Sequence, residues 1–576
     1  MQAVLDQNFV QDEIGLWVPV AGKRDFGYSD GAWVERYLEN AFRESSDLSS
    51  ESEELETYIK EWNTEYHLSR KRKDILSGLQ HNRSAKVLEI GSGCGAITRF
   101  LGETYDSVVA VEGSYNRARL ARLRTRDLDS VEVYASRYQD IGLEGQFDIV
   151  FCIGVLEYAP SYVDGDNPFH EALTSMRRML RPGGTLVLAI ENKFGLKYFS
   201  NSTEDHSGTF FEGIEGYPRK NRYFETFGKV ELKKLLSGYW DDVEFYFPFP
   251  DYKMPSLLLS EEGATALDVG EMLAGLPERD YARINVPLFD NRLAWREVAR
   301  NGLVSHLSNS FLVVAGAASV SPLAPKMNGR FATLFNRERR ACFTTRTDVE
   351  PGANGPVARK TAANPYISPA SGPFLFAPKP SEWMGEETIA YRLFWRAHDP
   401  KMDQATLLGG VKAWWKFISA SRTNGGEPVV PGEMLDAVWH NCCQMPDGSI
   451  ARFDHELSAA EGIDPSVLFV RAAFQWHARY SSAKLPHLMA SRGIGTIRRI
   501  AKATGIPVSK AHIRRFIDLE VSLQSSIGHT PEARARRAIR AGLYVPYLGT
   551  ISRYYKILRN NALRGKRLLL RLTKMT

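Results

Sequence analysis

The stretch that decides the fold is KVLEIGSGCGAITRFLGETYDSVVAVEG, residues 86–113. It predicts an apolar strand over residues 87–90, a turn with Gly91, Gly93 and Gly95, a helix, and a second apolar strand that ends on Glu112. Because glycine has no Cβ, such a turn bends tightly and lets a ligand lie against the backbone, while a carboxylate after the next strand can accept from both hydroxyls of a ribose. The pattern therefore predicts a nucleoside-binding turn. For a bare Gly-x-Gly-x-Gly, a purely structural loop is an equal alternative.

The residues that follow predict the rest of a parallel sheet. Apolar runs that indicate strands occur at residues 131–134, 147–153, 185–190, 243–247 and 310–315, with helical segments between most of them. Continuously apolar strands that alternate with helices are typical of a sheet covered on both faces. We expect this α/β domain to close near residue 320, with a long insertion before its last strand.

The spacing Glu89-x-Gly91-x-Gly93-x-Gly95 resembles motif I of the class I S-adenosylmethionine-dependent methyltransferases. Phe147-Asp148 before the fourth strand and Arg181-Pro182-Gly183-Gly184 before the fifth also match that family. The resemblance implies a Rossmann-like, seven-stranded sheet and S-adenosylmethionine as cofactor, with Glu89 toward its amino-acid end and Glu112 at its ribose. The other cofactor contacts that it implies are Gly91, Gly93, Gly95, Tyr138, Asp140 and Gly154. Many members carry an acid toward the adenine amine where this chain has Arg137-Tyr138-Gln139-Asp140, so backbone and Tyr138 are the alternative adenine contacts.

Catalytic candidates should follow the carboxyl ends of the strands, where this architecture places its cleft. By position they are Glu157, Glu191, Asn192, Asp205, His206 and Asp251. His206, which is flanked by Glu204-Asp205, is the first choice for a general base because its ordinary pKa lies nearest neutrality. Glu157 and Asp205 are the other catalytic candidates, although any of them can be a positioning group instead. The segment Gly154-Val155-Leu156-Glu157 lacks the Asn/Asp-Pro-Pro-Tyr of enzymes that methylate amino groups. A hydroxyl of a small molecule or sugar is therefore the expected acceptor.

A second constellation lies in the C-terminal half. Asp436 and Asn441 have the spacing of Asp-x-x-x-x-Asn in protein kinases, and Asp454 follows a turn and a short strand, as the second metal-binding Asp does in that fold. Lys360 would then reach the phosphates of ATP, and Asn441 and Asp454 would bind Mg²⁺. Leu435 replaces the usual Arg, His455 replaces the usual Phe, and no glycine-rich loop of the usual form precedes Lys360. A kinase-like fold without phosphotransfer and an unrelated helical domain remain alternatives.

Composition and charge indicate the cellular compartment of the protein. The 576 residues are 43% hydrophobic, and the five cysteines show no Cys-x-x-Cys pairing, which favours a reduced compartment without structural zinc. No apolar run approaches the roughly 18 residues that span a bilayer, and no signal segment is evident, so we expect a cytoplasmic protein. From Pro531 onward, twelve Lys and Arg stand against one acid, interleaved with Leu and Tyr. This suits an amphipathic helix on an anionic membrane surface, with a basic helix packed on its own protein as an equal alternative and nucleic acid disfavoured.

The expected organisation has four parts. They are an N-terminal helical lid region (1–80), the methyltransferase domain (81–320), an α+β kinase-like domain (331–530) and a basic amphipathic tail (531–576). Together both halves resemble the bacterial methyltransferase-kinase proteins that modify the growing end of cell-surface (O-antigen) polysaccharide. That resemblance implies O-methylation of a saccharide or lipid-linked glycan at the inner face of the membrane. A bifunctional methyltransferase-kinase, a methyltransferase with a non-catalytic scaffold, and a non-catalytic assembly factor are the alternatives.

Overall fold

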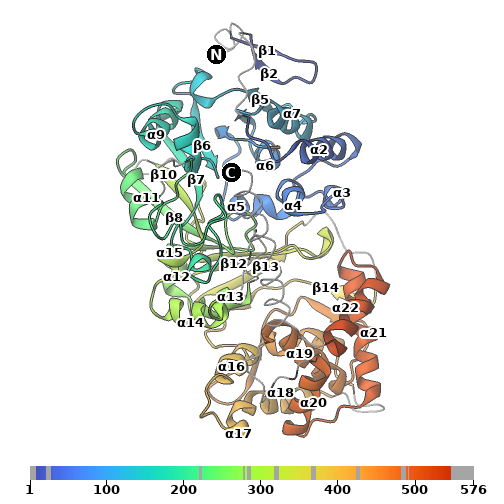
Figure 1. Cartoon of the computed structure of the whole chain (residues 1–576). Helices are drawn as coiled ribbons and strands as arrows, with labels where there is room; N and C mark the ends of the chain where they lie inside the picture. Colours follow the sequence, from blue (N-terminus) through green and yellow to red (C-terminus); the bar gives the residue numbers. More distant parts are fainter. Residues whose placement is uncertain are drawn as a thin grey trace, which may run out of the picture. The chain divides into compact units, whose positions relative to one another are not determined.

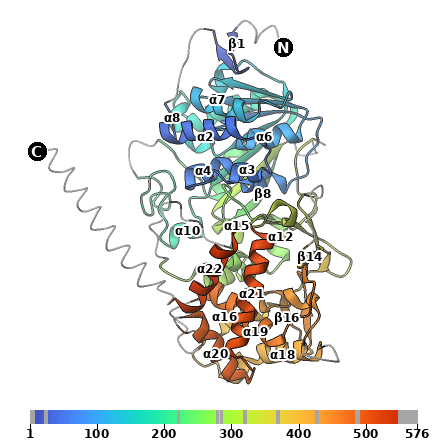
Figure 2. The same ribbon diagram turned by 90° about the vertical axis from the view of Figure 1, so that its right-hand side faces the viewer.

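The computed structural model describes residues 8–20, 27–218, 223–276, 279, 281, 287–316, 323–364, 372–422, 429–481, 488, 490 and 492–545. The chain divides into two compact units, Met1–Phe335 (unit 1) and Asn336–Thr576 (unit 2). Unit 1 is an α/β structure, and unit 2 combines small sheets with helices (Figures 1 and 2). Unit 1 extends beyond residue 320 because β11 (Ala332–Asn336) pairs with β9 (Leu257–Ser260) at an edge of its sheet.

All seven predicted strands of the sheet are present in unit 1. They are β3 (Lys86–Ile90), β4 (Ser107–Glu112), β5 (Val131–Ala135), β6 (Phe147–Ile153), β7 (Leu180–Glu191), β8 (Asp242–Phe249) and β10 (Ser310–Gly316). They lie in the order β5-β4-β3-β6-β7-β10-β8, and β10 runs antiparallel to both of its neighbours while β3 to β7 pair in parallel. This confirms the Rossmann-like methyltransferase sheet that the resemblance implied.

Helices cover the sheet on both sides, which explains why its strands need continuously apolar sequences. In Figure 1, α6 (Ala96–Thr104) and α7 (Tyr115–Arg124) lie on one side, and α9 (Pro168–Met179) and α11 (Lys229–Leu236) on the other. The residues of β6 are buried along its whole length. Removing such apolar area from water stabilises the fold by roughly 25 cal/mol per Å².

The N-terminal region forms helices that pack on α7, together with a short hairpin. The helices are α2 (Ala32–Glu44), α3 (Glu53–Glu56), α4 (Trp62–Leu68), η1 (Arg70–Lys73) and α5 (Asp74–Ser77). Val34, Leu38 and Phe42 of α2 share one apolar cluster with Leu120 and Leu123 of α7. The hairpin of β1 (Phe9–Gln11) and β2 (Trp17–Pro19) extends the sheet beyond β5, so this region is less uniformly helical than expected.

The long insertion before the last strand has its own helices. They are α12 (Glu261–Ala266), α13 (Gly270–Gly275), α14 (Asn291–Arg300) and α15 (Val304–Leu307). Strand β9 begins the insertion and pairs with β8, and β11 then pairs with β9. The sheet of unit 1 is therefore wider than the predicted seven strands on this side.

Unit 2 is built from short antiparallel pairings and a helical core. Its strands are β12 (Thr345–Glu350), β13 (Val357–Ala362), β14 (Phe374–Phe376), β15 (Ser381–Glu382), β16 (Cys442–Gln444), β17 (Ile450–Arg452) and β18 (Leu457–Ala459). Its helices are α16 (Ile389–Arg396), α17 (Gln404–Leu407), α18 (Gly409–Ala420), α19 (Pro465–Tyr480), α20 (Gly493–Thr504), α21 (Lys510–Ile527) and α22 (Glu532–Tyr544). Trp414, Trp439 and Trp476 are fully buried at its centre.

The predicted tail begins as a packed helix of unit 2. Helix α22 buries Ala535, Ile539 and Leu543 and contacts α19, α20 and α21. Leu543 is thus part of the protein core, which agrees with the alternative of a basic helix packed on its own protein for this part of the tail. The rest of the predicted tail, from residue 546, lies outside the described residues. Among the described helices, none combines the length and the apolar character that crossing a membrane requires.

Candidate active site

A cavity of about 400 Å³ lies at the carboxyl ends of β3, β4, β6 and β7. Ligands bind at this edge of open α/β sheets because the loops there present backbone and side-chain groups from several strands. The sequence-predicted residues that line it are Glu89, Gly91, Gly93, Glu112, Tyr138, Gly154, Glu157, Asp205 and His206. Gly95 and Asp140 were also predicted but are not among the lining residues, and Asp140 is exposed while the neighbouring Gln139 lines the cavity.

The turn after β3 requires glycine for two reasons. Gly91 and Gly95 have φ angles of 75° and 85°, which side-chain-bearing residues rarely adopt. A Cβ at Gly91 would also lie 2.5 Å from Cγ2 of Val155, and one at Gly95 would lie 2.8 Å from Cα of Ala121. Gly95 therefore lets α6 pack closely against α7, while Gly91 leaves bare backbone at the cavity.

Glu112 fixes this turn from the end of β4. Its Oε2 accepts a hydrogen bond of 2.8 Å from the backbone N–H of Gly93, and its Oε1 accepts one of 3.0 Å from that of Ser114. The carboxylate thus stands at the cavity wall in a fixed orientation. Each oxygen keeps a second lone pair, so hydrogen bonds from a diol remain possible.

Glu89 is a buried carboxylate at the end of β3. Its side chain is 2% exposed, and among the described residues its Oε2 has no hydrogen-bond partner. Burial raises the pKa of Glu89 from 4.5 to about 7, against the opposing effects of Thr98 and Arg72. A buried carboxylate with one unsatisfied oxygen is costly unless a positively charged or hydrogen-donating group reaches it. Glu89 is therefore suited to the amino end of a bound amino-acid moiety.

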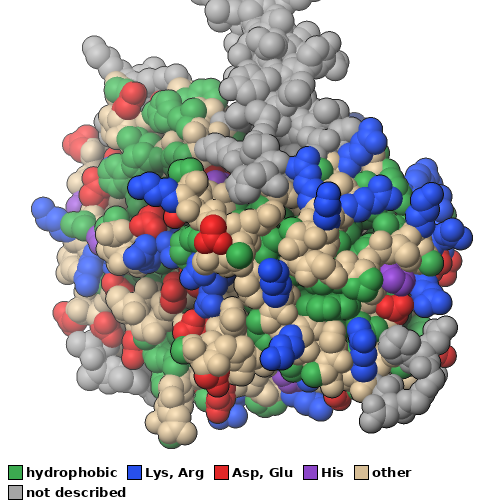
Figure 3. Space-filling view, turned by 90° about the horizontal axis from the view of Figure 1, so that it is seen from below, with side chains coloured by type: hydrophobic (Ala, Val, Ile, Leu, Met, Phe, Trp, Pro, Cys, Tyr) green, Lys and Arg blue, Asp and Glu red, His purple; other side chains and the backbone are tan. Residues whose placement is uncertain are grey.

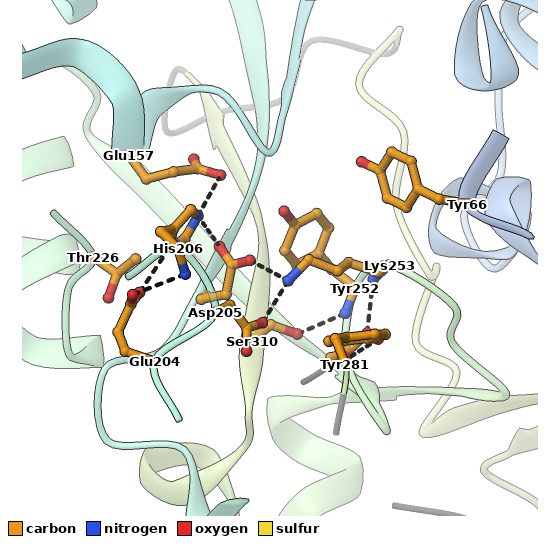
Figure 4. A network of polar contacts seen from close by, with 12 residues as sticks. Tyr66, Glu157, Glu204, Asp205, His206, Thr226, Tyr252, Lys253, Tyr281 and Ser310 are labelled. Atoms are coloured by element: carbon orange, nitrogen blue, oxygen red, sulfur yellow. Dashed lines mark hydrogen bonds and ion pairs between the residues drawn. The ribbon is translucent and has the colours of Figure 1, made fainter. Parts of the chain in front are cut away.

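At the far end of the cavity, a histidine lies between carboxylates (Figure 4). The Nδ1 atom of His206 is 2.7 Å from Oε1 of Glu204, and its Nε2 atom is 3.9 Å from both Glu157 Oε1 and Glu191 Oε2. Burial alone would lower the pKa of His206, but Glu191, Glu204 and Glu157 outweigh it and raise the pKa to about 9. His206 is therefore protonated at neutral pH in this structure. This corrects the expectation of a histidine that titrates near neutrality and serves as the ready base.

Asp205 is also held as a permanent anion. Its carboxylate accepts hydrogen bonds of 3.0 and 2.9 Å from Lys197 Nζ and one of 2.5 Å from Lys253 Nζ. These two ammonium groups lower the pKa of Asp205 despite its burial. Such a group is a weak proton acceptor, so Asp205 orients its neighbours instead. Among the other positional candidates Glu191 lines the cavity, whereas Asn192 and Asp251 do not.

Residues 88–188 match the family model described as a methyltransferase domain. The chain carries a class I S-adenosylmethionine-dependent methyltransferase domain. It is 31% identical over 119 residues to the cyclopropane-fatty-acyl-phospholipid synthase of Escherichia coli (strain K12), a match that covers 20% of this chain and 29% of that protein. It is 26% identical over 125 residues to the ubiquinone biosynthesis O-methyltransferase of Xanthomonas oryzae pv. oryzae (strain PXO99A), covering 21% and 49%. The chain thus spans less than half the length of these curated relatives.

Among solved structures, phosphoethanolamine N-methyltransferase 2 of Haemonchus contortus in complex with S-adenosyl-L-methionine is similar in fold. The match covers 43% of this chain and 52% of that one, with 17% sequence identity and a TM-score of 0.27.

The N-terminal helices contribute further lining to the methyltransferase domain. Tyr66 and His67 of α4 both line the cavity. His67 Nε2 is 3.0 Å from Oδ2 of Asp30, and the hydroxyl of Tyr66 accepts a hydrogen bond from Arg72. The contact with Asp30 therefore gives His67 a structural role in the N-terminal region, and its Nε2 atom already has a partner.

Sequence reasoning missed Arg72, Arg117 and Lys253, all of which line the cavity of the methyltransferase domain. Lys253 could have been found, because it follows β8 in a segment of aromatic and polar residues at the functional edge of the sheet. Arg117 lies in the first turn of α7 and Arg72 in η1, where no spacing in the sequence distinguishes them from surface arginines.

Outside the methyltransferase domain, unit 2 brings the kinase-like residues together. The Nζ atom of Lys360 on β13 forms ion pairs with Asp454 and, at 2.9 Å, with Oε2 of Glu456. The Asn441 side chain donates to the backbone carbonyl of Asp436, and Asp436 accepts from the N–H of Leu457. Asp436 is buried, which raises its pKa. The carboxylates of Asp436 and Asp454 thus have different surroundings, one packed inside and the other paired with a lysine.

Proposed function

We propose that this protein transfers a methyl group from S-adenosylmethionine to a hydroxyl of a small-molecule acceptor, with a saccharide or lipid-linked glycan as the leading candidate. One observation carries the proposal. A single cavity holds the glycine turn with Glu89 and Glu112 at one end and the buried group of Glu157, Glu191 and His206 at the other. The match of residues 88–188 to a methyltransferase family model supports the same activity.

The cofactor end of the cavity offers a complementary group for each part of the ligand. Glu89 would hold the amino group, Glu112 the ribose hydroxyls, and Tyr138 or the nearby backbone the adenine. When bound, S-adenosylmethionine supplies a methyl group on a positively charged sulfur. Tyr28 and Tyr66 line the same cavity from the N-terminal region and would exclude water from it.

Methyl transfer to a hydroxyl needs orientation and a group that takes up the proton. Glu157 and Glu191 are fully buried and present carboxylate oxygens that have no hydrogen-bond partner among the described residues. These oxygens would accept the acceptor's hydroxyl hydrogen and so direct the hydroxyl oxygen toward the methyl group. The charged His206 would hold both carboxylates in place.

The aromatic lining supports a sugar-like acceptor. Trp62, Tyr66, Tyr158 and Tyr162 line the cavity and combine flat apolar faces with polar edges, which suits a ring that carries hydroxyl groups. One curated relative is named for a fatty-acyl phospholipid and the other for ubiquinone biosynthesis, so lipid-linked and quinone-type hydroxyls belong in the same assays.

Two measurements test this function. Calorimetry should show S-adenosylmethionine binding that weakens at least about tenfold in Glu112→Ala, because removing paired charge-assisted hydrogen bonds costs roughly 1.5–3 kcal/mol. Equal binding by wild type and variant would remove Glu112 from the cofactor site. Formation of S-adenosylhomocysteine with saccharide, glycolipid and cell-envelope fractions should fall strongly in Glu157→Gln while cofactor affinity is kept. No turnover with any acceptor would favour a non-catalytic assembly factor.

A second activity is proposed for unit 2, because Lys360 lies there beside Asp454, the residue that the kinase-like spacing assigns to Mg²⁺. Unit 2 would then bind ATP with Mg²⁺ held by Asn441 and Asp454, and phosphorylate the same glycan. Magnesium-dependent ATP binding should be lost in Asp454→Ala and kept in Asp447→Ala, whose side chain lies in an exposed turn. If the wild type binds no ATP, unit 2 is a scaffold.

Association with an anionic membrane surface is the third part of the proposal. Exposed basic side chains occur on the last three described helices: Arg498, Arg499, Lys502, Lys510, Arg514, Arg515, Arg534, Arg537 and Arg540. Figure 3 shows Lys and Arg side chains gathered toward one side of the face that it displays. Salt-sensitive co-sedimentation with phosphatidylglycerol vesicles, absent with phosphatidylcholine alone, is the expected result.

A further inference from the structure

The buried group at the acceptor end has the composition of a metal site. Glu157 follows β6, Glu191 ends β7, and His206 lies in the loop beyond, so three chain segments converge on one point of the cavity. One ligand atom from each of the three side chains lies within 4.8 Å of the other two. We propose that Glu157, Glu191 and His206 bind a divalent metal ion, of the Mn²⁺ or Zn²⁺ type.

The strongest evidence is the unsatisfied state of the carboxylates. Glu157 and Glu191 are 0% exposed. Both oxygens of Glu157, and Oε2 of Glu191, have no hydrogen-bond partner among the described residues. Burying a carboxylate without compensation costs several kcal/mol, and a coordinated cation is one of the few groups that can compensate it.

The histidine is oriented as a metal ligand is. Glu204 Oε1 lies 2.7 Å from the Nδ1 atom of His206, which leaves Nε2 directed at Glu157 and Glu191. A carboxylate that holds the other ring nitrogen is the usual partner of metal-binding histidines, because it fixes the ring and raises its basicity. Lys253 fixes the orientation of Glu191 in a similar way. Its Nζ atom lies 2.5 Å from Oε1 of Glu191, which leaves Oε2 directed at His206.

The distances leave room for an ion. Two ligands at about 2.1 Å from the same ion are at most about 4.2 Å apart. The Nε2 atom of His206 is 3.9 Å from each of the two carboxylate oxygens. A small inward rotation of the carboxylates would therefore bring all three atoms within bonding distance.

The charges around the site also favour a cation. With a neutral, metal-binding His206, the surrounding ionisable groups are five acids and two bases: Glu157, Glu191, Glu204, Asp205 and Asp251 against Lys197 and Lys253. A divalent ion would offset most of this excess. Two carboxylates and one imidazole suit Mn²⁺ or Zn²⁺ better than Mg²⁺, which prefers oxygen ligands alone.

Such an ion would have a chemical role at this end of the cavity. A divalent cation lowers the pKa of a hydroxyl that it binds, and a hydroxyl acceptor needs this activation before it can attack a methyl group. The inference nevertheless rests on the geometry of the three side chains and does not depend on methyl transfer.

The test is direct metal binding by the full-length protein. After treatment with a chelator and dialysis, the protein is titrated with MnCl₂ under electron paramagnetic resonance and with ZnCl₂ in a calorimeter. We expect one tight site per chain. Binding should weaken at least a hundredfold in Glu157→Gln and His206→Ala, and ten- to a hundredfold in Glu204→Gln, which disturbs only the orientation of the ring.

The control is His170→Ala. His170 is exposed, and its Nδ1 atom lies 2.7 Å from the Tyr239 hydroxyl, away from the cavity. This variant should therefore bind the ion as tightly as the wild type. Unchanged S-adenosylmethionine affinity in each variant would show that the fold is retained. The proposal is overturned if the wild type takes up no ion at millimolar concentration, which would leave a protonated histidine shared by two carboxylates. It is also overturned if Glu157→Gln and His206→Ala bind as tightly as the wild type.

Discussion

At the scale of single residues, the cavity contains carboxylates that cost stability in the absence of a ligand. Glu89 illustrates this: burial raises its pKa from 4.5 to about 7, so ionising it in the folded protein is harder than in the unfolded chain. The native state therefore binds its proton more tightly, and the free energy of unfolding falls as the pH rises from about 4.5 to about 7. A residue that destabilises the empty protein in this way is expected where a ligand supplies the missing partner.

Replacing Glu89 by Gln should separate stability from binding. Without bound cofactor, Glu89→Gln should be more stable than the wild type at pH 8, by up to about 3 kcal/mol, and the difference should shrink at pH 5. Binding of S-adenosylmethionine should be weaker in the same variant. Urea unfolding at both pH values, with and without cofactor, measures both effects. A variant less stable than the wild type at pH 8 would mean that Glu89 is stabilised by its surroundings.

At the scale of elements, the turn between β3 and α6 couples packing to ligand access. Gly91 leaves open backbone at the cavity, whereas Gly95 allows α6 to approach α7. Both functions depend on the same positive φ angles, so the turn cannot be rebuilt with other residues without moving the helix. The lid helix α4 depends on this arrangement indirectly, because its last residue, Leu68, belongs to the cluster shared by α2 and α7.

Gly95→Ala tests the close approach of the two helices. Its Cβ would lie 2.8 Å from Cα of Ala121, so we expect a loss of roughly 2–4 kcal/mol in unfolding free energy and much weaker cofactor binding. Gly142→Ala is the matched control, because Gly142 also has a positive φ of 69° but nothing lies within 4 Å of its Cβ position. Only about 1 kcal/mol of backbone strain is expected there. Equal losses in thermal unfolding would show that backbone strain, and not contact with α7, makes Gly95 necessary.

At the scale of the whole molecule, the cavity and the kinase-like residues lie in different units. All residues that line the cavity belong to unit 1, between Tyr28 and Lys253. The paired Lys360 and Asp454 belong to unit 2. Helix α22 is a packed part of unit 2 and not the beginning of a free tail.

Leu543→Ala should therefore destabilise unit 2 without changing the methyltransferase site. Leu543 is 0% exposed, so truncation should cost roughly 2–5 kcal/mol, whereas Tyr544→Ala, 47% exposed in the wild type, should cost less than about 0.5 kcal/mol. Thermal unfolding and calorimetry with S-adenosylmethionine measure the two effects. If Leu543→Ala unfolds like the wild type and lowers only vesicle binding, α22 acts as a membrane anchor.

The sequence by itself determined the sheet, because continuously apolar strands that alternate with helices are a local pattern. The same local reasoning located the strand ends, and hence Glu157, Glu191 and His206. It also named Lys360 and Asp454 as kinase-like candidates, but the ion pair between them appears only in the folded structure. The match of residues 88–188 to a methyltransferase family model agrees with the predicted sheet.

Only the tertiary structure decided the protonation states and the partners. His206 was expected to titrate near neutrality, but three carboxylates from different segments surround it and hold its proton. Two lysines, one of which follows β8, balance the negative charge of Asp205, and Leu543 lies on a helix that packs against α19, α20 and α21. The physical reason is common to all three: charge and burial depend on groups that meet only after folding, and no spacing along the chain records them.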